Sequence, residues 1–256
     1  MKQVHYIVPI YGLRSLKGNI KLDKTTVLRN VDIFNKEDEF LTNAGLPNSY
    51  NVVLDIKYKF NETNPEEPIP GLNIKILNKI DACLILFEKC DAGLAAILQK
   101  QGLKYTCKYI LSTKKPILHE YLKIKSEKDF VDYFKKFQEA YSKRPLAFDI
   151  FRKSSVRFTN NDKAIDSCTI LESIFVPNGE RAKKQFIING MKIMGFEETY
   201  VQAINDLIDY RNAIIHADQV KTLKLLSGPK YTYVWFENTF EVVRKVLLGY
   251  VDKPWD

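Results

Sequence analysis

Histidine and cysteine are scarce in this sequence of 256 residues, which contains three histidines and four cysteines. Cys83, Cys90, Cys107 and Cys168 have no C-x-x-C spacing and no paired histidines near them. This pattern argues against a zinc site and against a disulfide framework, and it is typical of reduced intracellular thiols. We therefore expect no metal ion and no other cofactor.

Long apolar runs are also missing, since no stretch approaches the ~20 residues that a membrane-spanning helix needs. The apolar stretch near the N-terminus is too short for a signal peptide, and Pro9 interrupts it. The N-terminal half contains no P-loop, no G-x-G-x-x-G pattern and no clustered acid pair. We expect a cytoplasmic protein without a membrane partner, and no catalytic group in the N-terminal half.

Positive charge exceeds negative charge, with a formal net charge of +8. Residues 100–125 hold seven lysines against one glutamate, and Tyr105, Tyr109 and Tyr121 are interleaved with them. Lysines suit a phosphate backbone and tyrosines suit stacked bases, but a solvated basic face with half-buried tyrosines is the commoner cause of this pattern. The weak RNA-binding candidates in this segment are Lys104, Lys108, Lys114 and Lys115.

The fold class that these patterns predict is α+β, with a mostly β N-terminal domain over residues 1–125. Residues 50–60 form the clearest strand, because charged and apolar residues alternate along most of it. Ile20–Leu28 reads as a short hairpin. The other predicted elements are strands at Val4–Tyr11, Ala82–Phe87, Ala92–Leu98 and 104–112, helices at Asn35–Leu41 and Leu72–Ile80, and a loop at Asn61–Pro70.

The second domain, residues 126–256, reads as an α-helical bundle. Ser126 and the acidic residues after it are typical of a helix start, and an aromatic stripe from Phe130 to Tyr141 is typical of a buried helix face. Gly249 is the predicted stop of the last helix. The six predicted helices span 127–142, 146–158, 163–175, 180–194, 197–215 and 231–248.

Residues 209–218 read Asp-Tyr-Arg-Asn-Ala-Ile-Ile-His-Ala-Asp and close the fifth of these helices. Asn212 and His216 are four residues apart and share a helix face, whereas Arg211 and His216 are separated by about 140° of rotation. The apolar residues between them are expected to hold the segment in the core. A cation and an imidazole at a helix C-terminus also complement the helix dipole without any chemistry, so spacing alone leaves both interpretations open.

The spacing of Arg211, Asn212 and His216 resembles the Arg-x(4–6)-His motif of the HEPN superfamily. Residues 164–175, Ala-Ile-Asp-Ser-Cys-Thr-Ile-Leu-Glu-Ser-Ile-Phe, resemble the I-D…L-E-x-L/I-F helix of its Apea-like branch, and Phe-Arg-Lys-Ser-Ser-Val-Arg-Phe at 151–158 also fits that branch. A looser likeness extends to the β-rich half. The resemblance implies a helical bundle that forms a homodimer and, in active members, a metal-independent ribonuclease.

The chemistry of RNA cleavage matches these residue types. The 2′-hydroxyl of RNA is the nucleophile, so the enzyme must supply a base, an acid and a cation. His216 suits either proton-transfer role, because imidazole titrates near neutral pH, and Arg211 suits the phosphate, because its planar fork matches two oxygens. Asn212 is expected to orient the histidine or the phosphate. One histidine cannot easily serve as both acid and base, and a two-fold dimer supplies two.

Four further residues are supporting candidates. Glu172 lies in an apolar run, where a lone carboxylate needs a partner. Arg211 is the expected partner, and a plain surface glutamate is the competing interpretation. Asp166 is a weaker candidate, with a role limited to the helix dipole as its alternative. Lys183 and Lys184 are weak RNA-binding candidates, since a solvated helix face is the commoner cause of such lysines.

The sequence thus favours a metal-independent endoribonuclease of a prokaryotic toxin or antiviral defence system, such as abortive infection, with tRNA among the substrates. The cleaved RNA would carry a 2′,3′-cyclic phosphate. We expect the N-terminal half to sense a trigger such as a phage component, to bind RNA or to restrain the enzyme, and an antitoxin is a further expected partner. The alternative is a non-catalytic HEPN module that binds RNA or nucleotides or acts as a scaffold.

Overall fold

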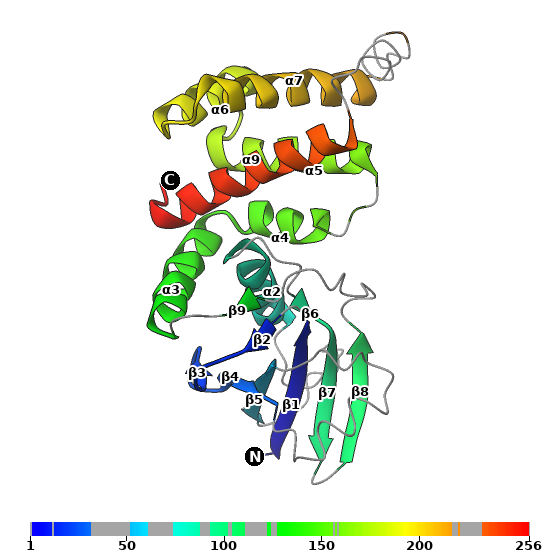
Figure 1. The fold of residues 1–256 in the computed structure, drawn as a ribbon, viewed down its shortest axis with the longest axis vertical. Helices are drawn as coiled ribbons and strands as arrows, with labels where there is room; N and C mark the ends of the chain where they lie inside the picture. Colours follow the sequence, from blue (N-terminus) through cyan, green and yellow to red (C-terminus); the bar gives the residue numbers. More distant parts are fainter. Residues whose placement is uncertain are drawn as a thin grey trace. The chain divides into compact units, whose positions relative to one another are not determined.

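The computed structural model describes residues 2–11, 13–31, 52–60, 74–87, 93–101, 104–110, 122–123, 127–155, 157, 159–216, 220 and 232–255. The chain divides into two compact units, Met1–Lys135 and Lys136–Asp256. The fold is α+β, as predicted, with an antiparallel sheet in the N-terminal half and helices after it (Figure 1). The division falls inside a helix, whereas the sequence places the domain boundary near residue 126.

The first unit is built on a sheet whose strands pair in the order β3–β4–β5–β1–β7–β8, with β6 also paired to β1. Each of these pairs is antiparallel. A separate parallel pair joins β2 (Leu13–Ser15) to β9 (Leu122–Lys123). The strands of the large sheet are β1 (Lys2–Tyr11), β3 (Ile20–Lys21), β4 (Thr26–Asn30), β5 (Val52–Phe60), β6 (Gly93–Leu94), β7 (Ala96–Gln101) and β8 (Lys104–Ile110).

Most strands lie where the sequence predicts them, but the predicted strand at Ala82–Phe87 is wrong. This segment is the second half of α2 (Ile74–Phe87), which also contains the helix predicted at Leu72–Ile80. A short apolar run does not distinguish a buried strand from a buried helix. Here Leu77, Ile80 and Leu84 are buried at helical spacing. The elements predicted at 35–41 and 61–70 lie outside the described residues.

Pro9 lies in β1, a central strand, where proline is unusual because it has no N–H to donate. The ladder on one side of β1 is interrupted at this point. β7 pairs with His5–Ile7, and β6 pairs with Ile10–Tyr11. Ala95, between β6 and β7, donates its N–H to the Pro9 carbonyl at 2.9 Å. The missing donor therefore coincides with a break between two strands.

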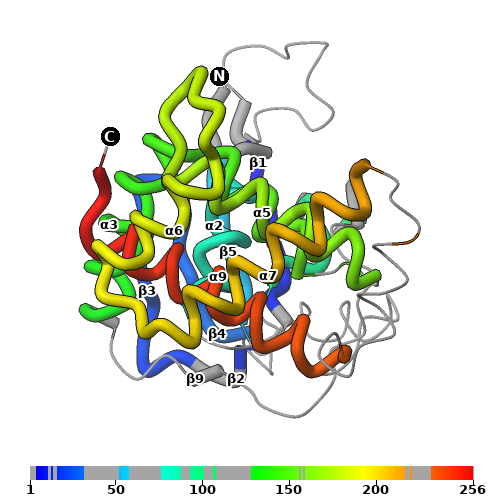
Figure 2. Tube along the Cα trace, turned by 90° about the horizontal axis from the view of Figure 1, so that it is seen from above, coloured from blue at the N-terminus to red at the C-terminus, as the bar shows by residue number. Residues whose placement is uncertain are grey.

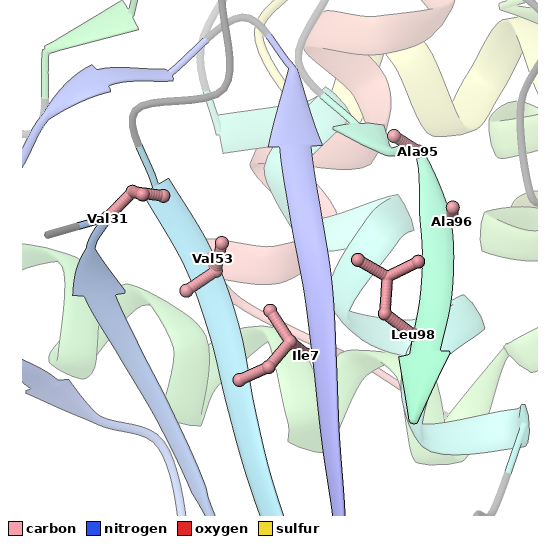
Figure 3. Packing of buried hydrophobic residues seen from close by; sticks show 6 residues of the cluster. All are labelled: Ile7, Val31, Val53, Ala95, Ala96 and Leu98. Atoms are coloured by element: carbon pink, nitrogen blue, oxygen red, sulfur yellow. The ribbon is translucent and has the colours of Figure 1, made fainter. Parts of the chain in front are cut away.

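One face of the sheet carries a small apolar cluster, shown in Figure 3. Ile7 of β1 lies directly opposite Leu98 of β7, and both side chains are almost fully buried. Alternation along the strands places His5 and Asp55 on the same face as Ile7. The cluster consists of Ile7, Val31, Val53, Ala95, Ala96 and Leu98.

Asp55 links three strands beside this cluster. His5 Nε2 of β1 lies 2.8 Å from Asp55 Oδ1, and Arg29 Nε of β4 donates to Asp55 Oδ2 at 2.8 Å. Burial by itself raises the pKa of Asp55, but the hydrogen bonds from His5 and Arg29 outweigh it and lower the pKa to about 2. Spacing along the chain indicated no partner for His5, and the pairing of β1 with β5 supplies one.

The second unit is a helical bundle in which α5 packs against α4, α6, α7 and α9. Figure 2 shows α6 beside α7, and residues of the two helices are in contact. No described helix has the length and apolar character that a membrane span needs. The six predicted helices are observed as α3 (Glu127–Lys143), α4 (Pro145–Ser154), α5 (Asn160–Phe175), α6 (Lys183–Ile193), α7 (Glu198–Ile215) and α9 (Tyr233–Asp252).

Gly249 does not end α9, so that prediction is wrong. The helix continues through it to Asp252. A Cβ atom at Gly249 would collide with the end of the Met194 side chain, and one at Gly190 would collide with the Phe175 ring. Both glycines allow a close approach between packed segments. The glycine that does end a helix is Gly195, which has a φ of 78°.

The charged cluster on the sheet predicts a specific pH dependence. The pKa of Asp55 falls from its ordinary value of 3.8 to about 2, which corresponds to about 2 kcal/mol of stability. Because the folded-state pKa is the lower one, this contribution is present above pH ~4 and is lost as the pH falls toward 2. We expect Asp55→Asn to lower the free energy of unfolding of the first unit at neutral pH, measured by urea denaturation.

Asp132→Asn is the matched control, because the Asp132 side chain is 53% exposed and its ion pair with Lys135 spans 3.5 Å. We expect it to change the free energy of unfolding by less than ~0.5 kcal/mol. The deficit of Asp55→Asn relative to wild type should shrink as the pH approaches 2. A deficit that stays constant between pH 7 and pH 2 would show that the ionised carboxylate contributes nothing.

Candidate functional site

The central segment of the site is the C-terminal end of α7. This helix buries Val201, Ile204 and Leu207 at a spacing of three residues, which fixes one face against the bundle. The helix ends at Ile215, and His216 is its C-terminal cap, with its N–H donated to the Asn212 carbonyl at 3.1 Å.

The expected burial of the apolar residues inside the motif holds only in part. Ala213 is buried, whereas Ile215 is 51% exposed. The motif therefore begins with partly buried residues, and its C-terminal end, from Ile215, lies at the surface.

Arg211 is held by two side chains. It forms an ion pair with Glu172 of α5, as predicted, and its Nη1 donates to Asn212 Oδ1 at 3.0 Å. The side chains of Arg211 and Glu172 are 19% and 18% exposed, so the pair is largely shielded from solvent. Asn212 thus orients the arginine, and no described hydrogen bond joins its side chain to His216.

Glu172 also binds a second cation. Lys183 Nζ, at the start of α6, donates to Glu172 Oε2 at 2.7 Å, while Oε1 accepts from Arg211. The row Arg211–Glu172–Lys183 therefore joins α7, α5 and α6 through one carboxylate. Two cations share one anion, so the row keeps a net positive charge. Sequence reasoning treated Lys183 only as a weak RNA contact, because its spacing gave no sign of a link to Glu172.

A second contact joins α6 to α7. Lys184 Nζ donates to Asp209 Oδ1 at 2.9 Å, with both side chains more than 40% exposed. Solvated ion pairs of this kind contribute ~0–1 kcal/mol.

These side chains border a cavity of about 580 Å³ between α6 and α7, which we call the basic hollow. Four cationic residues line it, namely Arg181, Lys183, Lys184 and Arg211, against the single carboxylate of Glu172. Nε of Arg211 is buried and has no hydrogen-bond partner among the described residues. Buried donors of this kind normally find an acceptor, and an oxyanion would supply one.

The His216 side chain stands apart from this arrangement. It is exposed at the end of α7 and is not among the residues that line the basic hollow. Its ring makes no hydrogen bond within the described part of the chain. The structure thus brings together Arg211, Asn212 and Glu172, and it leaves His216 at the surface of the same helix end.

Asp166 does not belong to this group. Its Oδ2 accepts from Ser154 Oγ at 2.7 Å and from Arg157 Nε at 3.2 Å, which ties α5 to the end of α4. The alternative role at the helix dipole is also wrong, because α5 starts at Asn160 and Asp166 lies beyond its first turn. Helix α4 ends at Ser154, short of the predicted Phe158.

The lysines predicted as RNA contacts have different positions. Lys183 and Lys184 both line the basic hollow. Lys104 and Lys108 lie on β8, and their side chains are outside the described set. Lys114 and Lys115 also lie outside the described residues.

Cys168 lies one turn before Glu172 on α5, in the core of the bundle. It is buried, and its Sγ is 3.9 Å from the carbonyl oxygen of Leu207. Burial raises the pKa of the Cys168 thiol to about 12, although the Arg211 guanidinium acts in the opposite direction. The thiol is therefore protonated at neutral pH and serves as a packing group. Among the residues that the structure describes, no three His, Cys, Asp or Glu side chains gather as a metal site would require.

No protein-family model, no curated protein and no solved structure matches this chain. The motif residues and the geometry around Arg211 are therefore the observations that bear on function.

The shared carboxylate predicts a stability effect. We expect Glu172→Gln to lower the free energy of unfolding of the second unit by about 1–3 kcal/mol, because it leaves the largely buried Arg211 without its anion. Asp209→Asn is the matched control, with an expected effect below ~0.5 kcal/mol because its ion pair is solvated. Urea denaturation of both variants makes the comparison. Equal effects would show that Glu172 does not hold the bundle.

Proposed function

We propose that the second unit is a metal-independent endoribonuclease of the HEPN type, acting as a homodimer. The observation that carries this proposal is the position of Arg211, which is fixed by Glu172 and Asn212 in the wall of a basic hollow. A fixed arginine among further cations suits a phosphodiester, because its charge and planar donor geometry match the phosphate oxygens.

In this proposal the phosphate of the scissile bond binds at Arg211. The 2′-hydroxyl attacks phosphorus, the bond to the 5′-oxygen breaks, and a 2′,3′-cyclic phosphate and a 5′-hydroxyl are formed. The base takes the proton of the 2′-hydroxyl, and the acid gives a proton to the leaving oxygen. Arg211 stabilises the negative charge that develops on the phosphoryl oxygens.

His216 supplies the proton transfer in this scheme, and the dimer supplies the second histidine. Two observations support a shared site. The His216 ring is exposed and makes no hydrogen bond with the residues that the structure describes. Large apolar side chains on both sides of it in sequence are also exposed, with Ile215 at 51% and Val220 at 79%. Exposed apolar groups beside a polar residue suit an interface between two copies of the chain.

Cleavage in the presence of EDTA tests the enzyme directly. We expect the wild-type protein to cut total tRNA or a generic single-stranded RNA into discrete fragments with 2′,3′-cyclic phosphate ends. His216→Ala and Arg211→Ala should each lower the rate by about 100-fold or more, since a general acid–base group and a cation that stabilises transition-state charge each contribute on this scale. The measurement is a denaturing gel together with analysis of the fragment ends.

Lys192→Gln is the control for this assay, because Lys192 is 53% exposed and lines neither the basic hollow nor the row of charges around Glu172. It should leave cleavage unchanged. Activity that disappears with EDTA and returns with Mg²⁺ would contradict the metal-independent mechanism.

The competing function is a non-catalytic module that binds RNA or nucleotides or acts as a scaffold. The observation that favours it is the separation of the His216 ring from the basic hollow. In that case the ion pair of Arg211 with Glu172 is structural, and the cations of the hollow provide binding without cleavage. The sheet of the first unit is then the expected place for recognition of a trigger or an antitoxin.

Toxicity on expression separates these two functions in cells. We expect the wild-type chain to slow the growth of a bacterial host, because an unrestrained ribonuclease degrades host RNA. His216→Ala should relieve the growth defect while the purified variant keeps the wild-type melting temperature. Equal toxicity of wild type and His216→Ala would exclude His216 as the catalytic residue.

A further inference from the structure

A second cavity, of about 390 Å³, adjoins the basic hollow. Glu172 and Lys183 line both cavities, so their ion pair is a shared wall between them. The second cavity extends toward Arg144 at the start of α4 and toward the turn after α5. We call it the neutral hollow.

The two hollows differ in charge. The basic hollow has four cationic side chains against one carboxylate. In the neutral hollow the cations Arg144 and Lys183 are balanced by Glu172 and Glu180. Its remaining wall combines hydroxyl and amide groups with apolar surface, from Thr169, Ser173, Asn178, Leu146, Val176 and Pro177. This lining suits an uncharged, planar group with hydrogen-bonding edges, which describes a nucleobase.

Arg144 is the residue in the neutral hollow with unused binding capacity. Its Nε is buried and has no hydrogen-bond partner within the described chain, and its Nη1 makes only a 3.4 Å contact with the Lys143 carbonyl. A guanidinium plane stacks on bases and donates to their edges. Leu146, which is 57% exposed, adds apolar surface nearby.

We propose that the neutral hollow binds a base of the single-stranded RNA whose phosphate lies on Arg211 in the basic hollow. The inference rests on the proposed function for the identity of the ligand as RNA. A phosphate and a base of one strand are linked through a ribose, so they need two adjacent pockets of different chemistry. Glu172 and Lys183 separate the basic hollow from the neutral hollow, and both residues border both hollows. Arg144 and Asn178 then determine which base is preferred.

Binding to strands with and without bases tests this inference. The probes are labelled 12-nucleotide oligomers of A, U, C or G and a strand of the same length made of abasic phosphodiester units. The protein is the full chain carrying His216→Ala, which prevents cleavage during the titration. Arg144→Gln in this background should weaken binding of the preferred base-containing strand by about tenfold. It should weaken binding of the abasic strand by less than about twofold, because the phosphate contacts remain.

Lys153→Gln is the matched control, since it removes the same charge from an exposed position of α4 that lines neither hollow. It should affect all strands equally and weakly. Asn178→Ala, in an exposed turn, is the second variant in case Arg144→Gln does not fold. It should change the order of preference among the four oligomers and leave abasic binding intact.

The outcomes separate this inference from the proposed enzyme. Equal weakening of base-containing and abasic strands by Arg144→Gln, or an unchanged base preference in Asn178→Ala, would overturn the base pocket even if wild type cleaves RNA. Base-dependent binding that Arg144→Gln weakens and whose base preference Asn178→Ala changes would support the pocket even if wild type does not cleave RNA. Absence of any binding to the oligomers would overturn both proposals. A nucleoside monophosphate competing as well as the oligomers would identify a free nucleotide as the ligand and would overturn the RNA assignment.

Discussion

The bundle of the second unit depends on one carboxylate that two cations share. Glu172 accepts from Arg211 of α7 and from Lys183 of α6, and it is itself placed by α5, the helix that contacts most of the bundle. Desolvating a carboxylate is costly unless it is paired and hydrogen-bonded. The row of three charges meets that requirement, and its surplus positive charge lies beside the basic hollow. The same contact therefore supports the packing and sets the electrostatics of the candidate site.

The sheet of the first unit also contains a partly buried carboxylate that two basic side chains share. Asp55 is held between His5 and Arg29 from the two neighbouring strands. Alternation along β1 and β5 puts these polar groups on the face that also carries the apolar cluster around Ile7. In both units a partly buried acid is stabilised by basic partners from separate elements. Neither set of partners is close in sequence, since 50 residues separate His5 from Asp55 and 39 separate Glu172 from Arg211.

The errors of the sequence analysis have physical causes. The apolar run at 82–87 fits a buried strand and a buried helix equally well, and only the packing of α2 decides between them. Glycine often ends a helix, yet Gly249 lies inside α9, where its lack of a side chain lets Met194 pack closely. Asp166 lies on the same helix as Glu172, but its carboxylate accepts hydrogen bonds from Ser154 and Arg157 and does not reach Arg211. In each case a tertiary neighbour gives the residue its role.

The sequence by itself determined the α+β class, most strands and the six helices. These features follow from hydrophobic periodicity and capping residues, which are local. The sequence also favoured Arg211 as the partner of Glu172, because a carboxylate in an apolar run needs a cation, but the packing of α5 against α7 decided that pair. Tertiary structure alone decided that Lys183 shares Glu172, that Asn212 binds Arg211, that two hollows adjoin across their ion pair, and that the His216 ring stands outside them. The reason is that these contacts depend on how α5, α6 and α7 cross, and no spacing along the chain encodes the distance between side chains on different helices.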